Sequence, residues 1–344
     1  MKTKDVFVGG LGVYVPEKMS METAVAEGMI DAAAAKEYDF AGIAVAGETP
    51  APDMALHAVR EALHRSGKDQ SALGMLLYAS VWYQGPDGWC PQYYIQRHAV
   101  GGNVVAAEVR QGCMGMFSAL ELAAGYLMGV PERDSAVITS ADNFNSPRID
   151  RLRFSPHFPM ADAGCAVVLS RTPGFARLES VNAVTLPEYE GMHRSGEPMF
   201  PPGETLGRPL NFAATKKHWM ENAEQPPGGP LPIIAAQDEL VNRTLEESGI
   251  GIDDVTKVAY VNGSRGRVEG RGMIPLGLPM SRSTWDFSRT IGHAGASDQF
   301  ISLEHLVRTG ELGPGDHFLM LGVGPGFNIA CAVFSILERP SWAE

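Results

Sequence analysis

The segment Ala55–Gly67 reads ALHAVREALHRSG, and the segment Gln237–Gly249 reads QDELVNRTLEESG. Both segments carry apolar residues at helical spacing, and both end in Ser-Gly, which is typical of a helix C-terminus. Eleven residues after each glycine stands a tyrosine, Tyr78 or Tyr260, inside an apolar run typical of a strand. The same order of helix, turn and strand is therefore present in each half of the chain.

The correspondence extends to a glycine-flanked segment in each half. Cys113, in the sequence Gly-Cys-Met-Gly, follows Tyr78 by 35 residues, and His293, in Gly-His-Ala-Gly, follows Tyr260 by 33 residues. Each is followed by a helical run, a glycine-containing turn and an apolar strand, which reads SAVITS in the first half and HFLMLG in the second. A series of matches in this order indicates an internal duplication.

The alternation of strands and helices predicts an α/β fold with parallel sheets covered by helices. We expect an N-terminal half, residues 1–172, that carries Cys113, and a C-terminal half, residues 173–344, that carries His293. The Pro- and Gly-rich stretch near residues 187–232 is predicted to be either a surface insertion or a cap over a substrate pocket. The elements predicted in the first half are strands at Val6–Val15, Gly74–Val81 and Ser135–Thr139, a helix at Asp53–Ser66 with Asp53 as N-cap and Gly67 after its end, and a helix at Phe117–Met128.

The composition of the 344-residue chain excludes several classes of protein. The formal net charge is −12, from 28 basic and 40 acidic residues, which argues against nucleic acid as the main partner. The four cysteines form no CxxC pair and the histidines show no metal-ligand spacing, so we predict no metal site. The first residues, MKTKDVFVGG, contain no long apolar segment, and the sequence has no apolar run of about 18 residues. We therefore expect a cytoplasmic protein without a signal peptide or a membrane segment.

Cys113 and His293 are the candidates for catalysis, because the duplication makes their positions equivalent. Equivalent positions of two like halves can meet near a pseudo-twofold axis, and both residues precede a predicted helix. The positive end of a helix dipole favours a thiolate, and a nearby imidazole favours it further. We therefore interpret Cys113 as a nucleophile and His293 as its base, rather than Cys113 as a buried inert thiol.

Four segments resemble those of a known family, in the same order along nearly the whole chain. They are VRQGCMGMFSALELA at Val109–Ala123, MADAGCAVVLS at Met160–Ser170, IGHAGASDQF at Ile291–Phe300 and LGVGPGF at Leu321–Phe327. The segments resemble the thiolase superfamily, and within it the ketoacyl-acyl-carrier-protein synthases of type III. The resemblance implies a five-layered α-β-α-β-α duplication, a homodimer, and a cysteine that takes an acyl group from acyl-phosphopantetheine or acyl-CoA without a cofactor. It also implies that the amides of Cys113 and Gly326 hold the oxyanion.

The chain departs from that family at two positions. The condensing members have His where Asn262 stands and Asn where His293 stands, so the two residue types look exchanged. The pattern is similar to that of type III-like acyltransferases of natural-product pathways, such as polyketide and antibiotic biosynthesis. It implies transfer of an acyl group from an acyl carrier protein or coenzyme A to a hydroxyl, an amine or a second carrier. The alternatives are decarboxylative condensation with a malonyl carrier, and a non-catalytic partner subunit.

Two residues are candidates to orient the His293 ring. Asn262 is predicted to hydrogen-bond the ring and fix its tautomer, as in a Cys-His-Asn set. Asp298 lies five residues after His293, just over one turn along the predicted helix, and is the other candidate. We rank Asn262 above Asp298; the competing interpretations are a turn residue for the first and a surface carboxylate for the second.

Further candidates lie in two short clusters. A basic cluster in SRGRVEGR is predicted either to dock an acidic carrier or CoA phosphates, or to belong to a solvated loop; it consists of Arg265, Arg267 and Arg271. Trp82, Tyr83 and Trp89, in VWYQGPDGWC, are predicted either to line the acyl pocket or to serve packing alone.

Overall fold

One sheet of nine strands runs through the part of the chain that the structure, a computed structural model, describes: residues 1–203, 205, 207–222 and 226–343. The strands lie in the order β5-β4-β6-β7-β1-β8-β11-β10-β9. Their bounds are β1 (Phe7–Tyr14), β4 (Leu73–Ala79), β5 (Val105–Val109), β6 (Ser135–Asp142), β7 (Ala163–Ser170), β8 (Ala176–Thr185), β9 (Val255–Ala259), β10 (His317–Gly324) and β11 (Asn328–Ile336). A separate small sheet pairs β2 (Lys18–Ser20) with β3 (Gly42–Ala44).

The order of strands is the same in the two halves when it is followed outward from the centre. The strands β1, β7, β6 and β4 on one side correspond to β8, β11, β10 and β9 on the other. On each side the first two pairings are antiparallel and the third is parallel. The two sets meet where β1 pairs with β8, at Phe7 and Val8. The predicted duplication is therefore confirmed, and the chain passes from one set to the other between Ser170 and Ala176.

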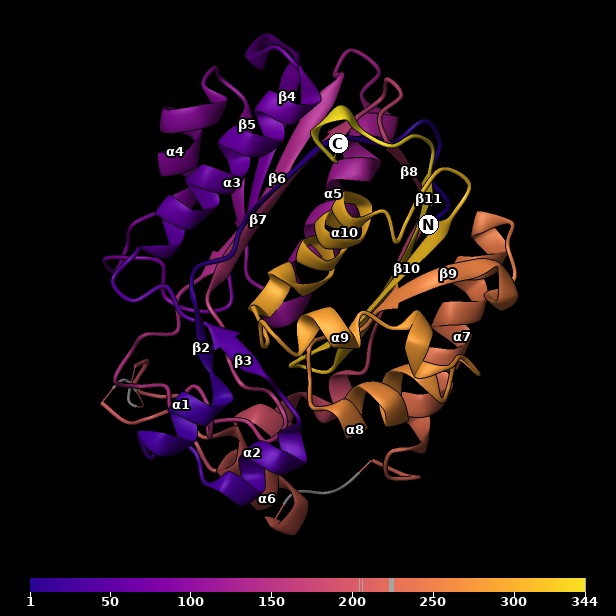
Figure 1. The fold of residues 1–344 in the computed structure, drawn as a ribbon. Coiled ribbons are helices and arrows are strands. Elements are labelled where there is room, and N and C mark those ends of the chain that lie inside the picture. Colours follow the sequence, from indigo (N-terminus) through magenta and orange to yellow (C-terminus); the bar gives the residue numbers. More distant parts are fainter. Residues whose placement is uncertain (204, 206, 223–225, 344) are drawn as a thin grey trace.

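Helices separate and cover the two sets of strands, which gives the five-layered arrangement that the resemblance implies (Figure 1). The helices α5 (Gly115–Gly129) and α10 (Asp298–Thr309) lie between the strands of the first half and those of the second. Helix α3 (Ala51–Ser66) covers the outer face of the first set, and α7 (Leu231–Ser248) covers the outer face of the second. The two central helices begin beside the catalytic candidates.

Two glycines of β1 allow α3 to lie directly on the sheet. A Cβ added at Gly10 would stand 2.1 Å from the carbonyl oxygen of Ala62, and one added at Gly12 would stand 2.1 Å from that of Ala58. Both distances are far below van der Waals contact, so any side chain here would push the helix off the strand.

The ends of α3 were predicted with mixed success. The helix begins two residues before Asp53, with Pro52 in its first turn, so the prediction of Asp53 as N-cap is wrong. Proline is tolerated there because the first N–H groups of a helix have no helical partner. Asp53 instead accepts a hydrogen bond of 2.7 Å from the hydroxyl of Tyr94. The C-terminus is as predicted: α3 ends at Ser66 and is followed by Gly67, whose φ is +61°. Helix α7 ends in the same way, followed by Gly249 with a φ of +73°.

The Pro- and Gly-rich stretch near residues 187–232 contains structure of its own. A 3-10 helix occupies Pro187–His193 and α6 occupies Phe212–Asn222, while residues 204, 206 and 223–225 lie outside the described part. The remaining α-helices are α1 (Met21–Ala26), α2 (Ala32–Tyr38), α4 (Pro91–Ile95), α8 (Arg265–Arg267) and α9 (Trp285–Ser288). No helix among the described residues is long and apolar enough to cross a membrane.

Candidate active site

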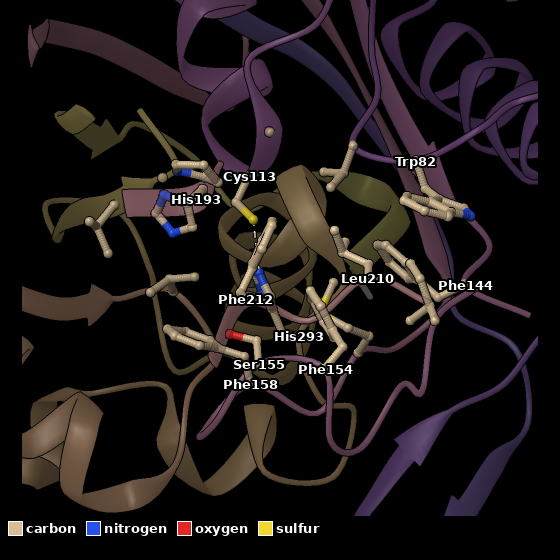
Figure 2. A pocket seen from close by; sticks show the side chains of 18 of the residues that line it. Trp82, Cys113, Phe144, Phe154, Ser155, Phe158, His193, Leu210, Phe212 and His293 are labelled. Carbon is tan, nitrogen blue, oxygen red and sulfur yellow. Dashed lines mark hydrogen bonds between the residues drawn. The ribbon is translucent and has the colours of Figure 1, made fainter. Parts of the chain in front are cut away.

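Cys113 and His293 lie against each other at the starts of the two central helices. Cys113 is in the 3-10 turn Gly112–Met114 that leads into α5, and His293 precedes the turn Gly295–Ser297 that leads into α10. The Cys113 Sγ atom is 3.0 Å from the His293 Nε2 atom (Figure 2). The structure thus brings together the two residues that the duplication made equivalent.

The backbone around His293 is held from both sides. Its amide donates to the carbonyl of Pro159 at 2.8 Å, and its carbonyl accepts from the amide of Ala161 at 2.8 Å. Gly292, just before it, has a φ of +87°, and a Cβ there would lie 2.9 Å from Ile43 Cγ2. The glycine of the Gly-His segment is therefore required both by its backbone conformation and by the close approach of a neighbouring chain segment.

Asp298 orients the imidazole of His293. Its Oδ2 atom is 2.6 Å from His293 Nδ1. The same buried carboxylate accepts hydrogen bonds from the amide of Ala294 at 2.7 Å and from the amide of Asn262 at 2.8 Å. A carboxylate beside Nδ1 places a ring proton on that nitrogen, and this directs Nε2 to the sulfur of Cys113.

The ranking of Asn262 above Asp298 is therefore wrong. The side-chain amide of Asn262 donates to the carbonyl of Gly292 at 2.9 Å, so Asn262 supports the loop in front of His293 instead of its ring. The ranking failed because a continuous helix between His293 and Asp298 would carry the carboxylate away from the imidazole. The chain instead forms a 3-10 turn at Gly295–Ser297, with the carboxylate returning to the ring.

The surroundings of His293 favour its protonated form. Burial alone would lower its pKa, but the Cys113 sulfur and the Asp298 carboxylate outweigh burial and raise the pKa well above its ordinary value. A pKa that is higher in the folded than in the unfolded protein means that protonation of His293 stabilises the fold. This stabilisation is complete below the ordinary histidine pKa of about 6.5 and is lost as the pH rises through the raised pKa of His293. A protonated His293 beside the Cys113 sulfur is suited to give its proton to a leaving group.

A cavity of about 360 Å³ opens in front of Cys113 and His293 (Figure 2). Its wall is mostly apolar, and its largest side chains are the aromatic rings of Trp82, Phe144, Phe154, Phe158, Phe212 and Phe327. The polar side chains of the wall, apart from the Cys-His pair, are those of Ser155, His193 and Arg267. The cavity therefore suits an apolar group attached to the Cys113 sulfur.

Three of the lining residues, His193, Leu210 and Phe212, come from the stretch near residues 187–232. The amide of Phe212 donates to the carbonyl of Phe154 at 3.0 Å, which ties this stretch to the pocket wall. Of the two interpretations left open by the sequence, the cap over a pocket is the one supported. Sequence reasoning missed these residues because Pro- and Gly-rich composition predicts no regular element; the apolar residues within it were the available signal.

Of the predicted aromatic cluster, Trp82 lines the cavity. Tyr83 and Trp89 are 42% and 40% exposed and are not part of its wall, so for them the prediction of pocket lining is wrong. Trp82 is held in place by Asp142, a fully buried carboxylate that accepts from the amides of Val81 at 2.9 Å and Trp82 at 2.7 Å. Burial raises the pKa of Asp142 to about 7. Asp142 is a supporting residue that sequence reasoning missed, because its partners are 60 residues away in the chain.

The other predicted residues lie around the cavity. Arg267 lines it, with its guanidinium 4.6 Å from the centre of the Phe158 ring. Arg265 is exposed, and its guanidinium nitrogen is 4.0 Å from a carboxylate oxygen of Asp39. Gly326 lies in the loop between β10 and β11, whose neighbouring residues line the cavity, and the oxyanion role of its amide stays a prediction. Within the described ranges, no group of three or more His, Cys, Asp or Glu side chains is placed to hold a metal ion.

Comparisons with known proteins show which family and which solved structures the chain is similar to. Residues 245–336 match the family model described as 3-oxoacyl-[acyl-carrier-protein (ACP)] synthase III C terminal. The mycobacterial beta-ketoacyl-[acyl-carrier-protein] synthase III of Mycobacterium marinum is 25% identical, over 94% of this chain and 93% of that protein. Among solved structures, the acyltransferase ChlB3 is 50% identical with a TM-score of 0.93, over 98% of this chain and 100% of that one. The 3-oxoacyl-[acyl-carrier-protein] synthase III from Aquifex aeolicus VF5 is 17% identical with a TM-score of 0.76, over 96% of this chain and 99% of that one, and shares the fold.

Proposed function

The chain belongs to the ketoacyl-acyl-carrier-protein synthase III-like proteins of the thiolase superfamily, and from this premise we propose that it is an acyltransferase to a hydroxyl or an amine. The donor is a thioester of an acyl carrier protein or of coenzyme A, and the intermediate is an acyl-enzyme on Cys113. The single observation that carries the proposal is the chain of contacts from Cys113 through His293 to Asp298, at 3.0 and 2.6 Å.

The first half-reaction loads the enzyme. The Cys113 sulfur attacks the thioester carbonyl, and the negative charge that develops on the carbonyl oxygen is held by the amides of Cys113 and Gly326, as in the family. Donors aimed at such an oxygen stabilise the transition state by a few kcal/mol each. The bond to the donor sulfur then breaks, and the protonated Nε2 of His293 gives its proton to the departing thiolate.

The second half-reaction releases the acyl group. His293 is now neutral, and its Nε2 takes the proton from the acceptor while the acceptor attacks the acyl carbon. The bond to Cys113 breaks, and the thiolate is left beside the imidazolium. Asp298 stabilises that imidazolium, as the third member of a Cys-His-Asp set.

The placement of Asn262 supports acyl transfer over condensation with a malonyl carrier. In the condensing members of the family, a His at this position and an Asn at the other hold the malonyl thioester oxygen together. The side-chain N–H of Asn262 donates a hydrogen bond to the carbonyl of Gly292, and the backbone N–H of Asn262 donates one to the carboxylate of Asp298. Asn262 thus supports the loop in front of His293 and is not part of the cavity wall, although its buried Oδ1 atom has no partner among the described residues. His293 is the imidazole that contacts Cys113 and is available for proton transfer.

The finer features of the proposal rest on the family and on the cavity wall. We propose a homodimer in natural-product biosynthesis, without a cofactor, loaded by an acyl carrier protein or coenzyme A. Arg267 at the wall and the exposed Arg265 beside it form the basic patch that receives the phosphate of the donor. The apolar wall favours an uncharged acyl group over a dicarboxylic one, because a carboxylate buried there would lose its hydration.

The experiment that tests the proposal gives the acyl-enzyme a choice of reactions. Protein loaded with a hexanoyl group is incubated with a malonyl carrier protein or with a panel of alcohols and amines. We expect release of hexanoyl esters or amides and no carbon dioxide above background, as measured by chromatography and by counting labelled carbon dioxide. Robust release of carbon dioxide together with a 3-oxoacyl product would show that the protein is a condensing enzyme instead. Failure of the protein to take up the hexanoyl group at all would favour a non-catalytic subunit.

Replacing Asp298 with asparagine should reduce acyl transfer by about 10³- to 10⁴-fold, because an amide does not stabilise the imidazolium or hold its tautomer. Loss of the carboxylate also lowers the pKa of His293, so the pH profile of transfer should shift to lower pH. The matched comparison is Asn262→Ala, which removes a loop contact and should cost far less. Single-turnover rates measured across pH would contradict the assignment if Asn262→Ala were the more damaging change.

A further inference from the structure

His193 is a polar side chain of the cavity wall that the reaction described above does not use. It ends the 3-10 helix Pro187–His193, and its ring packs edge-on against Phe212 with ring centres 4.8 Å apart. The cavity that it lines is the one that contains Cys113 and His293 (Figure 2). A second imidazole is thus held in the space where the acyl-enzyme and the acceptor must meet.

The surroundings of His193 keep its ring neutral. Burial, together with the charge of Lys216, lowers its pKa. Its Nδ1 atom is buried and has no hydrogen-bond partner among the described residues. Buried N–H groups without an acceptor are rarer than acceptors without a donor, so the ring proton belongs on Nε2. The Nε2–H group is then the donor that His193 can offer to a molecule in the cavity.

Three other side chains of the wall bear nitrogen: His293, Arg267 and Trp82. His293 lies between Cys113 and Asp298. Arg267, whose guanidinium lies over the Phe158 ring and whose buried Nε has no hydrogen-bond partner among the described residues, carries a full charge that suits a phosphate of the donor. A donor in a largely apolar cavity costs free energy unless a ligand brings the matching acceptor. His193 is therefore the neutral imidazole that the wall can offer to a polar atom of the incoming molecule.

We propose that His193 binds the acceptor of the acyl group, and that this acceptor is a neutral hydroxyl. The inference rests on the proposed function and names the acceptor for it. The Nε2–H of His193 donates to the hydroxyl oxygen, which leaves the hydroxyl hydrogen free to point at Nε2 of His293. His293 takes that proton, the oxygen bonds to the acyl carbon, and the carbon–sulfur bond to Cys113 breaks. An ester leaves, and the sulfur remains as a thiolate beside the His293 imidazolium.

The chemistry of this donor separates a hydroxyl from the other acceptors. A hydroxyl oxygen has lone pairs that accept a hydrogen bond well, whereas sulfur is a weak acceptor and an ammonium group has no free lone pair. A second carrier, whose acceptor is a thiol, therefore gains little from His193. The contact should matter for transfer to alcohols and should be dispensable for transfer to thiols.

The test compares an alcohol and a thiol on the same acyl-enzyme. Cys113 is loaded with a benzoyl or hexanoyl group from the N-acetylcysteamine thioester, and excess donor is removed. Benzyl alcohol or N-acetylcysteamine is then added, and loss of the acyl mass and formation of product are followed in single turnovers. We expect His193→Phe, which keeps a ring but loses both nitrogens, to slow transfer to benzyl alcohol about 10-fold while leaving loading and thiol transfer unchanged.

Two further variants separate recognition from structure. His193→Gln keeps a side-chain donor and should retain most of the alcohol transfer. His218→Phe changes an exposed histidine of α6 that is not part of the cavity wall, and it should behave as the unaltered protein in every assay.

Each other outcome overturns the inference. If His193→Phe transfers to the alcohol as fast as the unaltered protein does, His193 does not bind the acceptor. If His193→Phe loses alcohol and thiol transfer equally, the role of His193 is structural. If the loaded, unaltered protein transfers its acyl group only to the thiol, the assignment of a hydroxyl acceptor is overturned. Absence of any acyl mass on the unaltered protein would overturn the proposed function itself, and this inference with it.

Discussion

Cys113→Ala is expected to abolish acyl loading, with no adduct found by intact mass spectrometry after exposure to a panel of acyl thioesters. The Cys113 sulfur is the atom that His293 contacts at 3.0 Å, and alanine offers no atom on which a thioester can form. Because loading is the first bond-forming step, acyl transfer should fall to the solution rate, a loss on the order of 10⁶-fold.

The other cysteines provide the control for this experiment. Cys165 and Cys331 are buried, and burial raises the pKa of each to about 12, so both stay as unreactive thiols. Cys90 is exposed and is not part of the cavity wall, so Cys90→Ala should load like the unaltered protein. An acyl adduct on Cys113→Ala, or a failure of Cys90→Ala to load, would place the nucleophile elsewhere.

His293→Ala is expected to separate the two half-reactions. Loading should continue slowly, because a thiol can still ionise without a partner and attack an activated thioester. Transfer should fall by about 10²- to 10⁴-fold, since no other group takes the proton from the acceptor. The measurement is a single turnover in which the acyl mass forms first and its disappearance is then followed after the acceptor is added.

A distant histidine provides the comparison for His293. His64 is exposed near the end of α3, so His64→Ala should load and transfer as the unaltered protein does. Transfer at a normal rate in His293→Ala would remove His293 from the role of base. In that case the contact with Cys113 would serve loading alone.

The elements that could be predicted are those whose signal is local. Alternating apolar runs marked the strands, and the glycines after α3 and α7 marked the ends of both helices, since their positive φ favours glycine. The start of α3 was missed because a proline in the first turn leaves no side-chain cap to recognise. The cap of the pocket was left open for a similar reason, because its residues join the wall through contacts to a distant loop, such as the amide of Phe212 to Phe154.

The sequence by itself determined the duplication, and through it the pairing of Cys113 with His293. Both follow from order and spacing along the chain, and a repeated supersecondary unit must place its equivalent positions about a common axis. The tertiary structure alone decided which residue orients the imidazole and which residues enclose the acyl group. Asp298 rather than Asn262 meets His293, because a short 3-10 turn and a buried carboxylate that collects three donors outweigh the helical spacing. Such contacts join segments far apart in the chain, and their distances are set by packing instead of by local propensity.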